Sequence, residues 1–127
     1  HDYIIDSTEY DTLKTENIHD DTYQSNTAYG VLRQGKGICS GYSDTMALFL
    51  NKMGVPNFKA SSDMHVWNVV NVDGQWLNLD LTWDDPISID GLDYLEYDFF
   101  LIDSQTMQKI EKKEHNFNAE VYPEIAY

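Results

Sequence analysis

Two runs of branched and aromatic residues, joined by Asp73-Gly74, constrain this chain more than any other feature. The first run is MHVWNVVNV (residues 64–72) and the second is QWLNLDLTW (residues 75–83). An Asp-Gly pair between two such runs is a strong signal for a two-residue hairpin turn. The sequence therefore predicts an antiparallel pair of strands on which other elements can pack.

The predicted turn also determines which side chains share a face of the hairpin. With a two-residue turn, Trp67 lies opposite Asp80 and His65 lies opposite Thr82, so His65 and Asp80 are diagonal neighbours on one face. Such neighbours have Cα atoms roughly 7–8 Å apart, a gap that a carboxylate and an imidazole can bridge. A carboxylate on one ring nitrogen of His65 would fix the tautomer and leave the other nitrogen free to act as a base.

A helix is predicted over residues 39–53, directly after the glycine-flanked stretch GKGICSG (residues 35–41). Its apolar residues recur at helical spacing and form one stripe: Tyr42, Met46, Phe49, Leu50 and Met53. Gly54 suits the left-handed position after a helix, and Pro56 prevents continuation. A helix followed by antiparallel strands indicates an α+β fold rather than a doubly wound parallel sheet.

The remaining segments give shorter elements. Residues 1–8 predict a short helix or entry segment, and residues 27–37 a helical turn before the glycine loop. Residues 97–103 predict a strand, and residues 104–116 a short helix with Ser104 as its N-cap. Residues 15–26 and 84–96 have the composition of loops. We expect a single domain over residues 1–127, because this length suffices for one core and the sequence has no internal repeat.

Cys39 is the only cysteine, so any thiol chemistry belongs to it. A free thiol has a pKa of about 8.5 and is mostly protonated at neutral pH. A helix N-terminus and a nearby imidazolium both lower that pKa. A helix packed on the hairpin face of His65 and Asp80 would give Cys39 both influences.

The glycines around Cys39 add to this interpretation. Gly37 and Gly41 would leave room for a substrate carbonyl, and backbone N–H groups nearby could stabilise an oxyanion. One alternative is a buried, unreactive thiol. Another is a metal site made by Cys39, His65 and Asp80, although mixed ligands at long spacing without a second cysteine are atypical of zinc sites. We expect no metal and no cofactor.

The charge of the chain narrows its partners. A net charge of −14, with only 8 basic residues, disfavours nucleic acid and anionic membrane surfaces. No stretch approaches the ~18 apolar residues of a membrane-spanning helix, and no signal-peptide pattern opens the chain. Because the chain begins at His1 rather than Met, we expect a domain trimmed from a longer protein. Together with the acidic surface, this favours an extracytoplasmic location.

Three stretches in combination resemble the transglutaminase-like superfamily of papain-type fold, and its small bacterial and archaeal members in particular. They are AYGVLRQGKGICSGYSDTMALFLNKMGV (residues 28–55), MHVWNVVNVDGQWLNLDLTWDDP (64–86) and YDFFLIDSQTM (97–107) followed by a histidine. The resemblance implies a core in which the helix that starts at the nucleophile packs on an antiparallel sheet. It also implies that Cys39 is the nucleophile, His65 the general base and acid, and Asp80 the orienting carboxylate.

Further residues are candidates for shaping such a site, and each also has a packing interpretation: Tyr29, Gly41, Tyr42, Trp67, Asn68 and Trp83. The tyrosine at position 29 could approach the oxyanion, and the two tryptophans could line the acyl site or shield a thioester from water. The Gly-Tyr pair would shape the nucleophile loop, and the asparagine would brace its strand.

The other acidic and histidine candidates receive structural interpretations. Asp84 and Asp85 are predicted to cap a turn or to be solvated rather than to bind a cation. His1, His19 and His115 are predicted to be surface or packing residues.

The resemblance implies acyl transfer through a thioester. We expect hydrolysis of a peptide, protein or cell-wall-like amide bond. Two alternatives stay open at this point: crosslinking of protein glutamine to an amine, and a binding or scaffold module without turnover. Nothing in the sequence selects between water and an amine as the acceptor, or indicates the oligomeric state.

Overall fold

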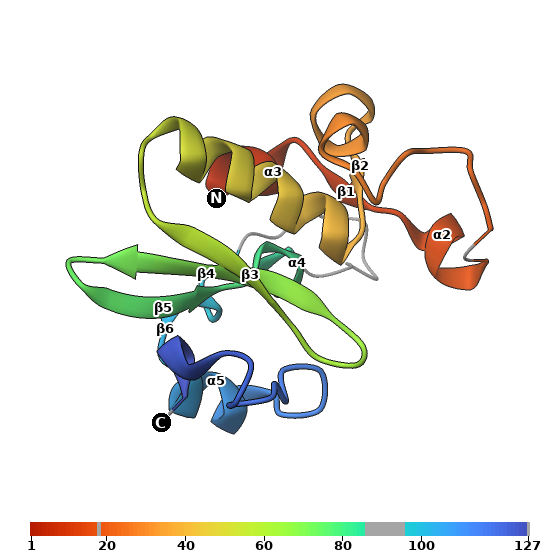
Figure 1. The fold of residues 1–127 in the computed structure, drawn as a ribbon. Helices are drawn as coiled ribbons and strands as arrows, with labels where there is room; N and C mark the ends of the chain where they lie inside the picture. The colour runs from red at the N-terminus through yellow and green to blue at the C-terminus, as the bar shows by residue number, and fades with distance from the viewer. Residues whose placement is uncertain (18, 86–95, 127) are drawn as a thin grey trace.

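A computed structural model describes residues 1–17, 19–85 and 96–126 of the chain (Figure 1). The segment before the long helix contains α1 (Asp2–Asp6), β1 (Glu9–Tyr10), α2 (Thr12–Glu16), the π-helical turn η1 (Gly30–Gln34) and β2 (Lys36–Gly37). The helix α3 (Cys39–Lys52) follows, and then the strands β3 (Asn57–Ser61), β4 (Val66–Val72) and β5 (Gln75–Leu79). The last elements are α4 (Leu81–Asp84), β6 (Phe100–Ile102), α5 (Ser104–Ile110) and the 3₁₀ turn η2 (Pro123–Ile125).

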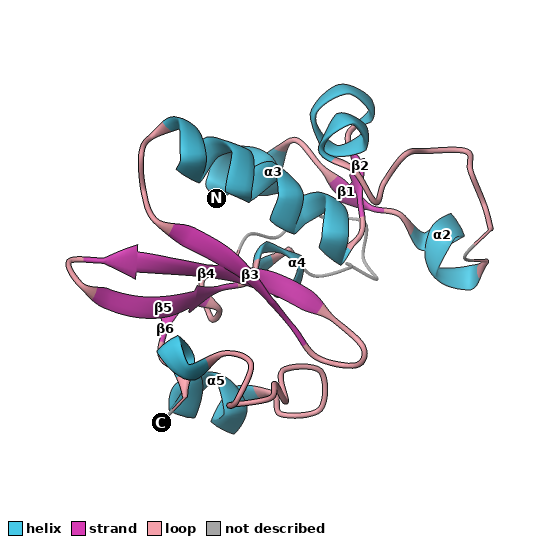
Figure 2. Ribbon diagram, viewed as in Figure 1, coloured by secondary structure: helices cyan, strands magenta, loops and turns pink. Residues whose placement is uncertain are grey.

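The main sheet has four strands in the order β3-β4-β5-β6, and all its pairings are antiparallel. Figure 2 shows α3 across one face of this sheet, with α5 and the C-terminal turn on the other face. The short strands β1 and β2 form a separate parallel pair before α3. The arrangement confirms the predicted α+β class and the antiparallel sheet.

The central hairpin has the predicted turn and register. Asp73 and Gly74 both have positive φ values, 52° and 87°, as a tight hairpin turn requires. The β4–β5 ladder runs from Val72↔Gln75 to Asn68↔Leu79, which are the pairs that a two-residue turn predicts. The hairpin register therefore follows from the local sequence.

An apolar cluster lies on each face of the sheet. One joins the sheet to α1, η1 and α3 and consists of Ile4, Ile5, Val31, Tyr42, Met46, Leu50, Val70, Leu79 and Leu81. The other joins the opposite face to α5 and the C-terminal segment and consists of Ala60, Trp67, Val69, Phe99, Met107, Phe117 and Ile125. The sheet is thus the middle of three layers.

The face that α3 covers differs from the expectation. The helix packs on the side of Val70 and Leu79, whereas Trp67 and Val69 point to the α5 side. The expected thiol–imidazole contact does not depend on that face, because His65 precedes β4 and Asp80 follows β5. Both residues lie beyond the paired strands, at the end of the sheet where α3 begins.

Asn68 explains how α3 is placed on an otherwise apolar face. Its side chain is buried, and its Nδ2 donates a hydrogen bond of 2.9 Å to the backbone carbonyl of Ser43 in α3. The apolar face alone would let the helix slide, because hydrophobic contact is non-directional. The hydrogen bond sets one position of α3 along β4.

Several predicted boundaries are wrong. The strand expected over residues 75–83 ends at Leu79, because the Asp80 side chain accepts a hydrogen bond from the Trp83 N–H and caps α4. Thr82 is therefore helical and does not lie opposite His65. The helix expected over residues 104–116 ends at Ile110.

The residues that begin and end the helices agree with the predictions only in part. Asp103, and not Ser104, caps α5, because the Asp103 side chain accepts from the Thr106 N–H. After α3, Gly54 has a φ of 73°, as predicted for a residue that ends a helix. Strands β1, β2 and β3 and helix α2 were not predicted. Most of the loop expected over residues 84–96 lies outside the described residues.

None of the helices in the described part of the chain is both long enough and apolar enough to cross a membrane.

Replacing Asn68 with leucine should lower the free energy of unfolding by about 1–3 kcal/mol, because the Ser43 carbonyl loses a buried partner. Urea denaturation would measure the change. The exposed Asn116 provides the matched control, and Asn116→Leu should stay within about 0.5 kcal/mol of the wild type. An Asn68→Leu protein as stable as that control would show that the hydrogen bond does not hold α3.

Candidate active site

Cys39 is the first residue of α3, and the side chain of the preceding Ile38 provides no cap. The first turn of a helix has backbone N–H groups without intrahelical partners. The backbone N–H groups of Ser40 and Val66 lie near the Cys39 sulfur and help to lower the pKa of the thiol. The thiol is partly exposed, so it combines stabilising donors with access from solvent.

The glycines beside Cys39 do not open space for substrate, contrary to the expectation. A Cβ atom at Gly41 would lie 2.1 Å from the Ser25 carbonyl oxygen, and one at Gly37 would lie 3.0 Å from the Tyr42 ring. The space around these glycines is filled by neighbouring parts of the chain. Their role is to let the segment before α3 approach the helix closely.

Asp80 connects the elements around the site. Its side chain is 1% exposed. Its Oδ1 accepts from the Trp83 N–H at 3.2 Å, while its Oδ2 is 2.7 Å from His65 Nε2 and 2.6 Å from His115 Nε2. Its backbone N–H donates to the Phe99 carbonyl at 2.9 Å. The carboxylate is therefore fixed from several directions.

His65 lies between Asp80 and Cys39. Its Nε2 is bonded to Asp80, which leaves Nδ1 as the ring nitrogen available to the thiol. The imidazole lies close enough to the Cys39 thiol to lower the pKa of the thiol, and the thiol in turn helps to raise the pKa of His65. It is 7% exposed and stacks near the Trp67 ring at a centroid distance of 6.0 Å. The structure thus brings together the three residues that the sequence predicts as nucleophile, base and orienting carboxylate.

The protonation preferences of these groups match a thiolate–imidazolium pair. Burial would lower the pKa of His65, but its bonds to Asp80 and Cys39 outweigh burial and raise the pKa to about 10. Burial would raise the pKa of Cys39, but the bond to His65, its charge and the two backbone donors outweigh it and lower the pKa. Burial likewise opposes the ionisation of Asp80, but the bonds from His115 and His65 lower its pKa. The pair is charged between the pKa of the thiol and about pH 10.

His115 is the member of the site that sequence reasoning missed. It is fully buried, its Nε2 contacts the same Asp80 oxygen as His65, and its Nδ1 lies 2.8 Å from Glu111 Oε2. The prediction of a surface or packing role was incomplete, because a packed histidine can also form hydrogen bonds. The i,i+4 spacing of Glu111 and His115 was a signal of their mutual contact but did not indicate the contact with Asp80.

The other candidate residues have different surroundings. Trp67 is buried, and its Nε1 donates to Asn78 Oδ1 at 2.9 Å on the neighbouring strand. Tyr42 is buried in the α3 cluster, and its hydroxyl donates to Asp85 Oδ2 at 2.5 Å. Trp83 packs partly buried against the α5 cluster. Tyr29 is 54% exposed.

Asp84 and Asp85 are buried, so of the two predicted roles, capping a turn or being solvated, solvation is wrong. Asp84 accepts from the Phe99 N–H at 2.8 Å and pairs with His1 Nε2 at 2.8 Å. Burial raises the pKa of Asp84 despite these bonds. This cluster holds α1 against α4.

Within the described residues, His65, Asp80 and His115 form the group that could hold a metal ion, since one donor atom from each lies within 4.8 Å of the others. Both imidazoles bond directly to the shared carboxylate oxygen. An ion would have to displace both hydrogen bonds. The arrangement is therefore better suited to ordering protons than to binding a metal.

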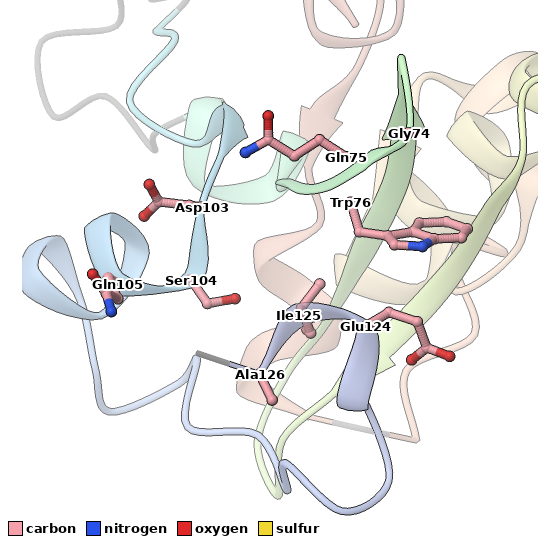
Figure 3. Close-up of a pocket in the computed structure, with 9 residues that line it drawn as sticks. All are labelled: Gly74, Gln75, Trp76, Asp103, Ser104, Gln105, Glu124, Ile125 and Ala126. Atoms are coloured by element: carbon pink, nitrogen blue, oxygen red, sulfur yellow. The ribbon is translucent and has the colours of Figure 1, made fainter.

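The described part of the chain includes two surface pockets. The pocket in Figure 3 has a volume of about 400 Å³ and includes Gly74 and Trp76, so it lies at the turn end of the hairpin, opposite the end that carries His65 and Asp80. A second pocket of about 380 Å³ is lined by residues 61–63 and 116–118, among others. These segments directly precede Met64 and follow His115. The second pocket therefore borders the histidine side of the site.

Comparisons with known proteins bear on the family and the fold of the chain. The family described as the transglutaminase-like superfamily matches residues 1–81, which include Cys39, His65 and Asp80. A solved structure described as a crystal structure of a TGase matches with a TM-score of 0.54 and 26% identity, over 62% of this chain and 23% of that chain. The chain thus spans about a quarter of that protein. Among curated proteins no significant match is found.

The reactivity of Cys39 toward iodoacetamide should rise with a midpoint below about 8.5, the value for a free thiol, because His65 and two backbone N–H groups favour the thiolate. His65→Ala should move the midpoint to 8.5 or above, since burial then acts without an opposing charge. Alkylation rates across pH, followed by mass spectrometry, would measure both.

The exposed His19 is the control, and His19→Ala should leave the midpoint unchanged. A wild-type midpoint at or above that of His65→Ala would contradict an activated thiol.

Proposed function

Because the chain belongs to the transglutaminase-like superfamily, we propose that it is a cysteine-dependent acyl-transfer enzyme that hydrolyses peptide or other amide bonds. The observation that carries the proposal is the closeness of the Cys39 thiol to His65, which lowers the pKa of the thiol, together with the 2.7 Å distance from His65 Nε2 to Asp80 Oδ2. A buried carboxylate that orients an imidazole against a partly exposed thiol is the arrangement needed to activate a nucleophile.

The first half of the reaction forms a thioester. The Cys39 thiolate attacks the amide carbonyl carbon, and the carbonyl oxygen takes up the negative charge of the tetrahedral intermediate. Backbone N–H groups at the start of α3 are the available donors for that oxygen. As the C–N bond breaks, the His65 imidazolium gives its proton to the leaving amine, and the acyl group stays on the Cys39 sulfur.

The second half returns the enzyme to its starting state. His65, now neutral, takes a proton from the acceptor as the acceptor attacks the thioester carbonyl. The C–S bond then breaks and the Cys39 thiolate leaves, so the thiolate and the imidazolium are both restored. Asp80 keeps the ring of His65 oriented in both halves, because its carboxylate is held by Trp83 and His115.

Water is the proposed acceptor, and a primary amine is the second candidate. The observation that favours the amine is the similarity to a structure described as a TGase. The third alternative, a scaffold without turnover, is disfavoured by the assembled site, because a scaffold has no need for an ordered thiol–imidazole–carboxylate set.

The proposed substrate is a protein, peptide or cell-wall-like amide of neutral or positive charge. The chain has a net charge of −14, which repels polyanions and favours cationic partners at the encounter stage.

An activated ester such as p-nitrophenyl acetate tests the thioester step without requiring the natural substrate. The wild type should release nitrophenolate in a burst and carry one acetyl group on Cys39, as intact-mass measurement would show. Cys39→Ala should lose the burst. His65→Ala should slow it by roughly 10²–10⁴-fold, the usual contribution of a general base.

His19→Ala again serves as the control for removal of a histidine, with an unchanged burst expected. Adding a fluorescent primary amine and a glutamine peptide then separates the acceptors: labelled peptide indicates amine transfer, and released ammonia alone indicates hydrolysis. An acylation rate in Cys39→Ala equal to that of the wild type would refute the proposed function.

A further inference from the structure

Both ring nitrogens of His115 face carboxylate oxygens. Nε2 lies 2.6 Å from Asp80 Oδ2, and Nδ1 lies 2.8 Å from Glu111 Oε2. The side chain is fully buried, so water cannot replace either partner. Glu111 is held in turn, because its carboxylate accepts from the N–H groups of Lys113 and Glu114.

These contacts bear on which ring nitrogens of His115 carry a hydrogen. An ionised carboxylate can only accept hydrogen bonds, so each nitrogen that faces one must carry a hydrogen. The bonds to their histidine partners outweigh burial and lower the pKa of Asp80 and of Glu111, so both are ionised at neutral pH. Each ring nitrogen of His115 therefore has an acceptor for an N–H, Nε2 toward Asp80 and Nδ1 toward Glu111.

Aromatic rings surround the buried imidazole of His115. The His115 ring stacks on Phe99 at a centroid distance of 5.0 Å, and the rings of Trp67 and Trp83 lie at 5.1 and 5.7 Å. A cation near aromatic rings is stabilised by their electron density, and more so where water is excluded. The two tryptophans, for which the sequence offers either a place at the acyl site or a packing role, thus lie against the imidazole of His115.

We propose that His115 is a positioning residue of the cysteine site: a buried imidazolium, held by Glu111, that fixes the shared oxygen of Asp80 and weakens the pull of that carboxylate on His65. The site then becomes a row of alternating charges that runs from Cys39 through His65, Asp80 and His115 to Glu111. The inference rests on the proposed function only in assigning His65 the task of proton transfer.

The effect on His65 follows from sharing one oxygen. The two imidazole rings lie 5.3 Å apart, so a positive charge on His115 disfavours a positive charge on His65. A lone carboxylate would hold the His65 proton more tightly and make it a poorer acid for a leaving amine. The other charged groups nearby are Cys39, which contacts His65, and Asp84, which lies near Asp80; the variants below leave both in place.

Nuclear magnetic resonance of the 127-residue chain labelled with ¹⁵N-histidine tests the proposal directly, because the sequence has only 4 histidines. Proton–nitrogen spectra distinguish a protonated from an unprotonated ring nitrogen. At pH 7 the wild type should show both nitrogens of His115 protonated. His115→Gln and His19→Gln assign the signals.

Glu111→Gln is the main variant, because it removes the outer carboxylate from a partly exposed position and leaves the core intact. Its His115 should lose the Nδ1 proton at pH 7. At pH 10, near the wild-type midpoint of His65, the protonated fraction of His65 should rise above the wild-type value. In His115→Gln, which keeps a neutral donor to Asp80, the midpoint should rise by on the order of one pH unit.

Glu114→Gln is the matched control, since it removes the same charge one residue from His115 and leaves the Glu111 contact in place. It should change neither histidine. The proposal is overturned if wild-type His115 has an unprotonated ring nitrogen at pH 7, or if Glu111→Gln leaves the His65 titration unchanged. Neither readout requires turnover. If the protein forms no thioester, the proposed function is refuted, but the spectra still test the role of His115.

Discussion

The arrangement of this molecule depends on the hydrogen bonds that the buried carboxylate of Asp80 accepts. One oxygen caps α4, where the chain leaves β5, and the other bonds to His65 before β4 and to His115 after α5. A buried charge is costly unless it is fully hydrogen-bonded, so this carboxylate tolerates little displacement of its partners. The hydrogen bonds that stabilise the buried Asp80 carboxylate therefore also fix the position of His65, which faces Cys39.

The hairpin could be predicted from sequence because its determinants are local. Asp73 and Gly74 specify the turn, and the turn specifies the register, so His65 and Asp80 were predicted as neighbours before any tertiary contact was known. The start of α3 at Cys39 and its end before Gly54 follow from equally local signals.

The face on which α3 packs could not be predicted in this way, because both faces of β4 are apolar and both become buried. The choice depends on the bond from Asn68 to Ser43 and on which elements cover the opposite face. The role of His115 escaped prediction for the same reason. It is 35 residues from Asp80 and carries no periodic pattern that links the two.

Because the chain is acidic overall, the lowered pKa of Cys39 must come from groups close to the thiol. A net charge of −14 acts against a thiolate everywhere on this protein, and burial acts against it at this position. The pKa of the thiol is nevertheless lowered, because His65 and two backbone N–H groups close to it outweigh burial. Short-range, partly buried contacts thus determine the chemistry of the site, and the exposed acidic surface is left to influence which partners approach.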